Sequence, residues 1–175
     1  MKRIVLLLLL PLMTLGIGAA HADDSAKPKL LMFDFALQDD MKPDLSSADD
    51  PVMLQRTLTL SDDVRTYLAN EGQFDLIDNS KHREAIARVI GARNFYGCRA
   101  CYMDAAKKVG AEYVAVGWVE RISNLIIEFN MRIESVATGK VVDKAYVSIR
   151  GNTDKSWHDG FTFLIKDYRN RWTKG

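Results

Sequence analysis

The clearest pattern in this chain is the alternation of apolar and polar residues between positions 113 and 150. In its middle segment the apolar positions are Ile127, Phe129, Met131 and Ile133. The positions between them are Ile126, Glu128, Asn130, Arg132 and Glu134. This period of two predicts a β-strand with one face in the core and the other at least partly solvated.

Two further strands are expected beside this one. An apolar segment, Tyr113 to Ile122, precedes it, and a less strictly alternating one, Val141 to Ile149, follows it. Short turns at Ser123-Asn124 and at 137–139 join the three segments, so the pattern predicts a three-stranded antiparallel meander.

Helical spacing appears on both sides of the meander. Asp50-Pro51 is typical of a helix start, with a side-chain acceptor at the N-cap and proline in the first turn, and Gly72 is a plausible stop. Shorter helices are expected over 81–90 and 98–109. The last helix is strongly amphipathic and is capped by Thr153 or Asp154.

With strands at 29–37 and 74–78, the predicted order is β-α-β-(α)-α-β-β-β-α. This order indicates an α/β fold, a two-layer sandwich in which a mixed sheet of about five strands carries helices on one face.

The N-terminus has the pattern of an export signal. Lys2 and Arg3 precede an apolar run, and Ala20-His21-Ala22 has the small-x-small form of a signal peptidase site. Residues 1–22 are therefore expected to be a cleaved signal peptide, and residues 23–175 a single periplasmic domain without a membrane span. Removal of the signal lowers Lys+Arg from 24 to 22 against 23 acidic residues, and a near-neutral chain gives no reason to expect nucleic acid as a partner.

Cys98 and Cys101 are the only cysteines, and the expected compartment is oxidising, which favours a disulfide. Because the loop it closes is tiny, the bond either fixes local geometry at a helix start or is redox-active. A helix N-terminus and Arg99 would favour the thiolate, which keeps a thiol–disulfide function open. The remaining alternative for the two cysteines is that they bind a metal or stay unpaired. The sequence as a whole predicts neither a metal site nor a cofactor.

The segment 150–157 is the second candidate site. Asn152 and Asp154 are explained by turn and cap chemistry, and Trp157 by the core. Arg150 is less well explained, and either pairs with Asp154 or meets an external anion. The functional alternative makes Arg150, Asn152, Asp154 and Trp157, together with Asn124, a binding edge for a partner.

No catalytic constellation supports an enzyme. Ser156 and His158-Asp159 fall on one helical turn, where neighbouring side chains point apart and cannot form a relay. The acidic segment 39–50 lacks the spacing of a calcium loop.

Two resemblances extend this interpretation. The segment Gly110-Ala111 to Val142, ending in Thr138-Gly139-Lys140, resembles the N-terminal domain of TolB, which implies a related α/β fold. Cys98-x-x-Cys101 with Arg150-Gly151-Asn152-Thr153-Asp154-x-Ser156-Trp157 is similar to a family of small exported bacterial proteins of unknown function.

The second resemblance implies a periplasmic location and an association with quinoprotein alcohol-oxidation systems. We therefore expect a non-enzymatic binding or accessory module that contacts a periplasmic protein or a small ligand. A thiol–disulfide protein and an envelope-assembly component are the alternatives. An exposed edge strand would also allow a homodimer by strand pairing.

Overall fold

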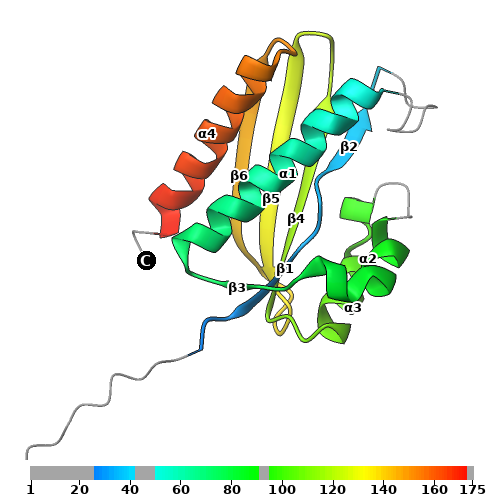
Figure 1. Cartoon of the computed structure of the whole chain (residues 1–175), viewed down its shortest axis with the longest axis vertical. Helices are drawn as coiled ribbons and strands as arrows, with labels where there is room; N and C mark the ends of the chain where they lie inside the picture. Colours follow the sequence, from blue (N-terminus) through cyan, green and yellow to red (C-terminus); the bar gives the residue numbers. More distant parts are fainter. Residues whose placement is uncertain (1–25, 42–49, 91–94, 173–175) are drawn as a thin grey trace, which may run out of the picture.

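The computed structural model describes residues 26–41, 50–90 and 95–172, and its centre is a six-stranded mixed sheet (Figure 1). The predicted signal peptide lies outside the described residues. The strands are β1 (Lys29–Met32), β2 (Ala36–Asp39), β3 (Asp75–Leu76), β4 (Tyr113–Arg121), β5 (Ile126–Ser135) and β6 (Val141–Arg150). Their order is β3-β1-β4-β5-β6, and β2 pairs with β4. Strands β1 to β4 pair in parallel and the meander β4-β5-β6 is antiparallel, which confirms the mixed sheet.

The helices are α1 (Pro51–Glu71), α2 (Arg83–Ile90), α3 (Arg99–Lys108) and α4 (Asp154–Trp172), with short 3₁₀ turns η2 (Asn79–His82) and η3 (Phe95–Gly97). The structure confirms the helix caps that the sequence predicted. The Asp50 carboxylate accepts a hydrogen bond from the backbone N–H of Met53 at the start of α1, and Gly72 ends that helix in the left-handed conformation. At the start of α4, the Thr153 hydroxyl accepts a hydrogen bond from the backbone N–H of Ser156.

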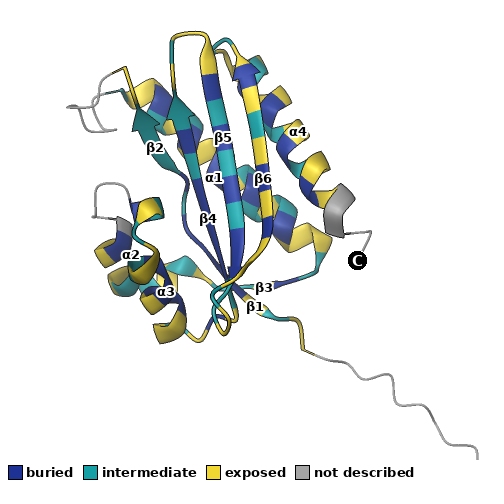
Figure 2. Ribbon diagram, turned by 180° about the vertical axis from the view of Figure 1, so that it is seen from behind, coloured by how far each residue is buried: buried dark blue, intermediate teal, exposed yellow. Residues whose placement is uncertain are grey.

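Helices cover both faces of the sheet, which corrects the expectation of helices on one face. Alternate residues of β1 show this, since successive side chains of a strand point to opposite faces. Leu30 and Met32 belong to a core shared with α1 and α4, whereas Leu31 and Phe33 belong to a second core shared with α2 and α3. Seen from behind, α2 and α3 lie beside the lower part of β4 and leave β6 and most of β5 uncovered on that side (Figure 2).

The expected single strand over 29–37 is divided into β1 and β2. Both pair with β4, β1 along its first residues and β2 along its last. Between them the backbone N–H of Phe35 donates to the Ser61 hydroxyl of α1 at 2.9 Å, and the Phe35 ring lies over Gly117. A Cβ at Gly117 would meet this ring at 2.6 Å, so glycine allows the close approach that interrupts the strand.

The meander has the predicted facing. Ile127, Phe129 and Ile133 are fully buried beneath α1 and α4. Glu134 departs from the expected solvated face: it is only 1% exposed, because α3 covers this end of β5. The pairing of β5 with β6 also shifts between Ile133 and Glu134, which explains why the alternation in the last strand is weaker.

Candidate functional site

The turn between β6 and α4 brings together three of the predicted site residues around one that the sequence did not indicate. Arg56 of α1 donates from Nε to Asp154 at 2.8 Å, and from one terminal nitrogen to the Asn152 side-chain oxygen at 2.9 Å. The Trp157 indole N–H donates to the same oxygen of Asn152 at 2.9 Å. Asn152, Asp154 and Trp157 therefore tie α1 to the start of α4, and Asp154 pairs with Arg56 instead of Arg150.

Asn124 belongs to a different cluster. Its side-chain oxygen accepts a hydrogen bond from Arg121 at 2.6 Å, and Arg121 also contacts the carboxylates of Asp39 and Asp50, each at 3.1 Å. Arg121 is largely buried. The cluster joins β2, the N-terminus of α1 and the turn between β4 and β5, so it fixes the upper end of the sheet.

Arg150 lies apart from both clusters, exposed on the side of the sheet that faces away from α1 and α4. The uncovered side chains of β5 and β6 on this side form a surface that we call the open face. Its members are Ile126, Glu128, Asn130, Lys144, Tyr146, Ser148 and Arg150. Tyr146 is 54% exposed, and its hydroxyl donates to Glu128 at 2.6 Å, which holds the ring in place across the two strands.

One end of the open face meets a buried carboxylate that organises α3. Glu134 accepts hydrogen bonds from the Tyr102 hydroxyl at 2.6 Å, from Arg132 Nε at 2.8 Å and from Arg99 Nε at 2.8 Å. Burial raises the pKa of the Glu134 carboxyl, but the hydrogen bonds from Tyr102 and Arg99 and the charge of Arg132 outweigh it, so the pKa lies below its ordinary value. Glu134 is therefore a charged anchor inside the protein.

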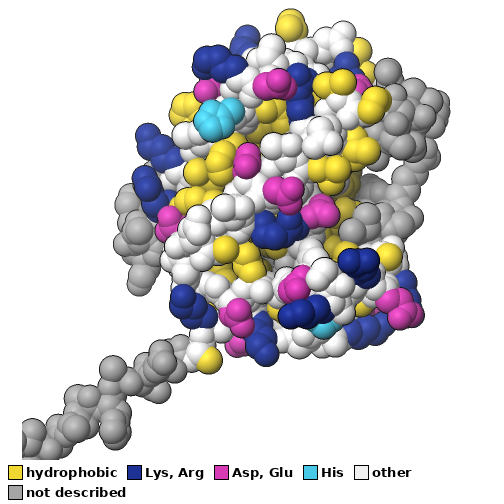
Figure 3. Space-filling view, in the orientation of Figure 1, with side chains coloured by type: hydrophobic (Ala, Val, Ile, Leu, Met, Phe, Trp, Pro, Cys, Tyr) yellow, Lys and Arg dark blue, Asp and Glu magenta, His cyan; other side chains and the backbone are white. Residues whose placement is uncertain are grey.

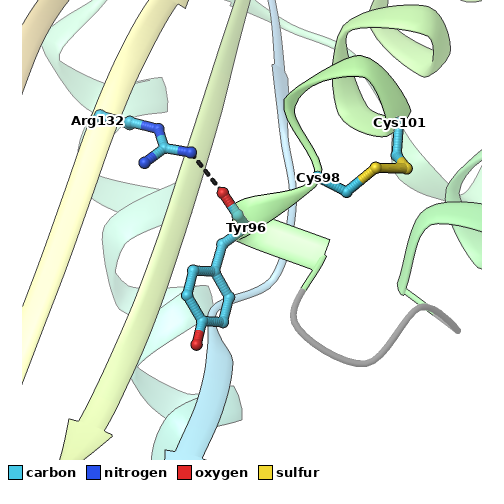
Figure 4. The surroundings of a disulfide bond; sticks show 4 residues. All are labelled: Tyr96, Cys98, Cys101 and Arg132. Carbon is cyan, nitrogen blue, oxygen red and sulfur yellow. Dashed lines mark hydrogen bonds between the residues drawn. A yellow bond between two sulfur atoms is a disulfide. The ribbon is translucent and has the colours of Figure 1, made fainter.

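The disulfide lies at the start of α3, next in the chain to the donors Arg99 and Tyr102, and Figure 4 shows it just after Tyr96, whose carbonyl oxygen accepts from Arg132 of β5. Cys98 and Cys101 are bonded, with their Cα atoms 5.3 Å apart, which confirms the predicted pairing. Arg99 lies between the two cysteines and Tyr102 follows them, so the bond fixes the turn that presents both donors to Glu134. The Arg99 side chain is directed to Glu134. A bond in this place can fix local geometry, which is one of the two roles that the sequence left open, and the redox role stays a prediction.

An aromatic stack connects the anchor to the open face. The Tyr96 and Trp118 rings lie parallel, with centroids 5.1 Å apart and planes at 9°. Arg132 donates to the Tyr96 carbonyl oxygen at 2.5 Å, and its guanidinium lies 5.3 Å from the Trp118 ring centre. A hollow of about 560 Å³ between this stack and β6 is lined by Trp118, Asn130, Met131, Arg132, Val141, Lys144, Ala145, Tyr146 and Asp167.

Carboxylates gather at the opposite end of the open face. Glu120 of β4 lies directly across from Glu128 of β5. The pKa of the Glu120 carboxyl is raised by burial and then by the charges of Asp40 and Glu128. The open face therefore has an acidic end near Glu120 and a cationic border formed by Lys144 and Arg150 of β6. By contrast, both signs of charge are mixed over the face that carries α1 and α4 (Figure 3).

Sequence reasoning missed the anchor, the stack and Arg56, because each joins elements far apart in the chain. The signal that was present is the pair Arg132 and Glu134, two residues apart on one face of a strand. Only the position of α3 shows that one of them is buried. Among the described residues, no three His, Cys, Asp or Glu side chains come together in a way that would hold a metal ion. Within the same residues no helix has the length and apolar character needed to cross a bilayer.

Comparison with known proteins identifies the family. The family model DUF3280, described as a protein of unknown function (DUF2380), matches residues 28–168. The chain belongs to DUF3280. This confirms the uncharacterised family that the cysteine pair and the segment 150–157 indicated. A comparison with curated proteins gives no match.

Solved structures resemble this DUF3280 protein in fold. Lipoprotein GNA1162 from Neisseria meningitidis is 16% identical with a TM-score of 0.53, over 83% of this chain and 96% of that one. The LpoB C-terminal domain from Escherichia coli is 22% identical with a TM-score of 0.47, over 74% and 87% of the two chains. The PelC dodecamer from Paraburkholderia phytofirmans is 14% identical with a TM-score of 0.47, over 81% and 84%. The resemblance to the N-terminal domain of TolB is a narrower statement than these matches make, and it stays a prediction.

Proposed function

We propose that this DUF3280 protein is a non-enzymatic accessory module of the periplasm, which binds a protein partner through the open face. In this proposal residues 1–22 are removed on export, and residues 23–175 fold as the single domain that remains. The observation that carries the proposal is the uncovered side of β5 and β6, where ordered side chains of both charges flank the half-exposed Tyr146 ring.

The open face has the chemistry of a protein-binding surface. Aromatic side chains and arginine are enriched at such interfaces, and a ring that is already held in place loses little freedom on binding. The Tyr146 ring is fixed by Glu128, and the Tyr96–Trp118 stack with Arg132 borders the same surface. The acidic end at Glu120 and the cations Lys144 and Arg150 would fix the orientation of the partner.

Two hydrogen-bonded clusters at the upper end of the sheet hold the strands of the open face in place. Arg56 with Asn152, and Arg121 with Asn124, fix the loops at the upper end of the sheet, so the strands of the open face keep their relative positions. Arg150 is the member of the predicted binding set that reaches the open face. The association with periplasmic quinoprotein oxidation systems is a narrower proposal that rests on the sequence resemblance, and it names the partner class to test first.

Site-specific photo-crosslinking in the producing bacterium tests the proposal. A photoreactive residue at Asn130 or Tyr146 should give an adduct with one protein, which mass spectrometry then identifies. The same residue at Thr59, on the exposed side of α1, is the matched control. Adducts that are absent, or that are the same at Thr59 as on the open face, would contradict the proposal. Osmotic-shock fractionation and N-terminal sequencing test the compartment separately, with Asp23 the expected first residue.

A further inference from the structure

Strand β6 ends the sheet, and the features that protect its edge, a shift in pairing, the inward-facing Asp143 and the charged Lys144, all lie in its first half. It is ten residues long and pairs with β5 on one side, and it is the last strand of the sheet in the part of the chain that the structure describes. An edge of this length presents a row of backbone donors and acceptors that can pair with another strand. Such pairing needs backbone N–H groups of β6 that point away from β5 and have no other acceptor.

The register of β6 shows which of its backbone amides point away from β5. The backbone N–H of Gly151 donates to the Leu125 carbonyl oxygen, so it points toward the β4–β5 turn. Pairing is regular from Asp143 to Arg150, and successive amides of a strand alternate in direction. The amides of Tyr146, Ser148 and Arg150 therefore point away from β5.

The next outward amide is already used. The backbone N–H of Lys144 donates to the Asp143 carboxylate at 2.8 Å. The available edge is thus the segment 146–150, which is symmetric about Ser148.

Charge selects the partner and the register. In an antiparallel pair of two copies centred on Ser148, Tyr146 lies opposite Arg150 of the second copy, and the reverse pair occurs by symmetry. An aromatic ring opposite an arginine is a favourable cross-strand pair. Shifting the register by one pair in one direction would place Lys144 opposite Arg150, and like charges directly opposite each other are unfavourable. The edge is therefore complementary to itself in the register centred on Ser148.

Helix α4 offers an apolar contact at the same level. Asp167 lines the hollow together with Lys144 and Ala145 of β6, and Phe163 precedes Asp167 by four residues, on the same face of the helix. Phe163 is 62% exposed. Since Gly160 lies against Ile149, and a helix advances about 1.5 Å per residue against about 3.3 Å for a strand, Phe163 is level with Ser148.

We propose that two copies of this protein associate through their β6 edges, with a two-fold axis that passes Ser148. The sheets of the two copies continue into each other, Tyr146 of each copy packs on Arg150 of the other, and the two Phe163 side chains meet between the α4 helices. Such an isologous contact closes on itself. It also places the two open faces side by side, and it is independent of whether those faces bind a protein.

Sedimentation equilibrium of the full chain, over about two decades of concentration around micromolar, measures the association. The unaltered protein should be a dimer. In the Tyr146→Lys variant, the new lysine of each copy lies opposite Arg150 of the other copy. These two like-charge pairs should raise the dissociation constant by roughly tenfold or more. Adding Arg150→Glu to that variant creates two opposite-charge pairs and should restore the dimer. Phe163→Ser should weaken it, whereas Leu125→Ser, at an exposed apolar residue away from β6, should not.

A single cysteine tests the axis directly. In the proposed register Ser148 of one copy and Ser148 of the other form a hydrogen-bonded pair. Their Cα atoms are then about 5.5 Å apart, which is within disulfide range. Ser148→Cys should give an oxidised, covalently linked dimer, and Lys144→Cys on the same strand should not. A protein that stays monomeric throughout the range would overturn the proposal. So would a dimer that ignores Tyr146→Lys and gives no Ser148→Cys crosslink.

Discussion

Replacing Glu134 by glutamine tests the central claim that a buried carboxylate holds α3 on the sheet. The substitution keeps the size of the side chain and one acceptor oxygen but removes the charge. Tyr102, Arg132 and Arg99 would then donate to a neutral group, and one of them would face the new NH₂ donor.

The magnitude follows from the two donors that are themselves mostly buried, Tyr102 and Arg132. A hydrogen bond to a charged group contributes about 1.5–3 kcal/mol, against about 0.5–1.5 kcal/mol for a neutral pair. Loss of the charge should therefore cost about 2–3 kcal/mol for the two bonds together. Arg99 is half-exposed, so water screens its contribution and none is added for it.

Urea denaturation followed by circular dichroism measures this free energy of unfolding, and pH gives a second test. The pKa of Glu134 is lowered in the folded protein, so its stabilising contribution is fully present above the pKa of the unfolded chain, about 4.3. That contribution is lost as the pH falls through the lower, folded pKa. The stability difference between the unaltered protein and Glu134→Gln should therefore be constant near neutral pH and shrink in acid.

Glu84→Gln is the matched control, because Glu84 also pairs with an arginine, Arg88, but on the exposed side of α2. A surface pair contributes about 0–1 kcal/mol, so this variant should stay close to the unaltered protein. The reasoning is refuted if Glu134→Gln is no more destabilising than the control, or if its effect grows as the pH falls.

Three further predictions concern other parts of the framework. Replacing Cys98 and Cys101 by serine should cost about 2 kcal/mol or less, because the loop they close is short, and the cost should be non-additive with Glu134→Gln in urea denaturation; simple additivity would show that the bond does not position the donors. Arg56→Ala should cost about 2 kcal/mol by removing the hydrogen bonds of the corner, measured by the same method, and an unchanged midpoint would contradict that role. Gly160→Ala should destabilise by about 1–3 kcal/mol despite the better helix propensity of alanine, because its Cβ would meet Phe129 at 2.7 Å; a stabilised variant, seen as a raised melting temperature, would show that α4 can move away.

The sequence by itself determined the elements that rest on local patterns. The Asp50-Pro51 start of α1, the alternation around Phe129 and the cap at Thr153 each depend on residues near in the chain. The disulfide also followed from the sequence, since two cysteines three residues apart in a chain that is expected to be exported favour pairing with each other.

Only the tertiary structure decided which polar residues are buried and which are free. Period two places Glu134 on the same face as Glu128, yet Glu134 is buried and Glu128 is half-exposed, because α3 crosses only one end of the strand. Likewise Asp154 pairs with Arg56, nearly a hundred residues away, which leaves Arg150 exposed on the open face. Periodicity records the direction of a side chain from its own strand, and the packing of distant elements decides what that side chain meets.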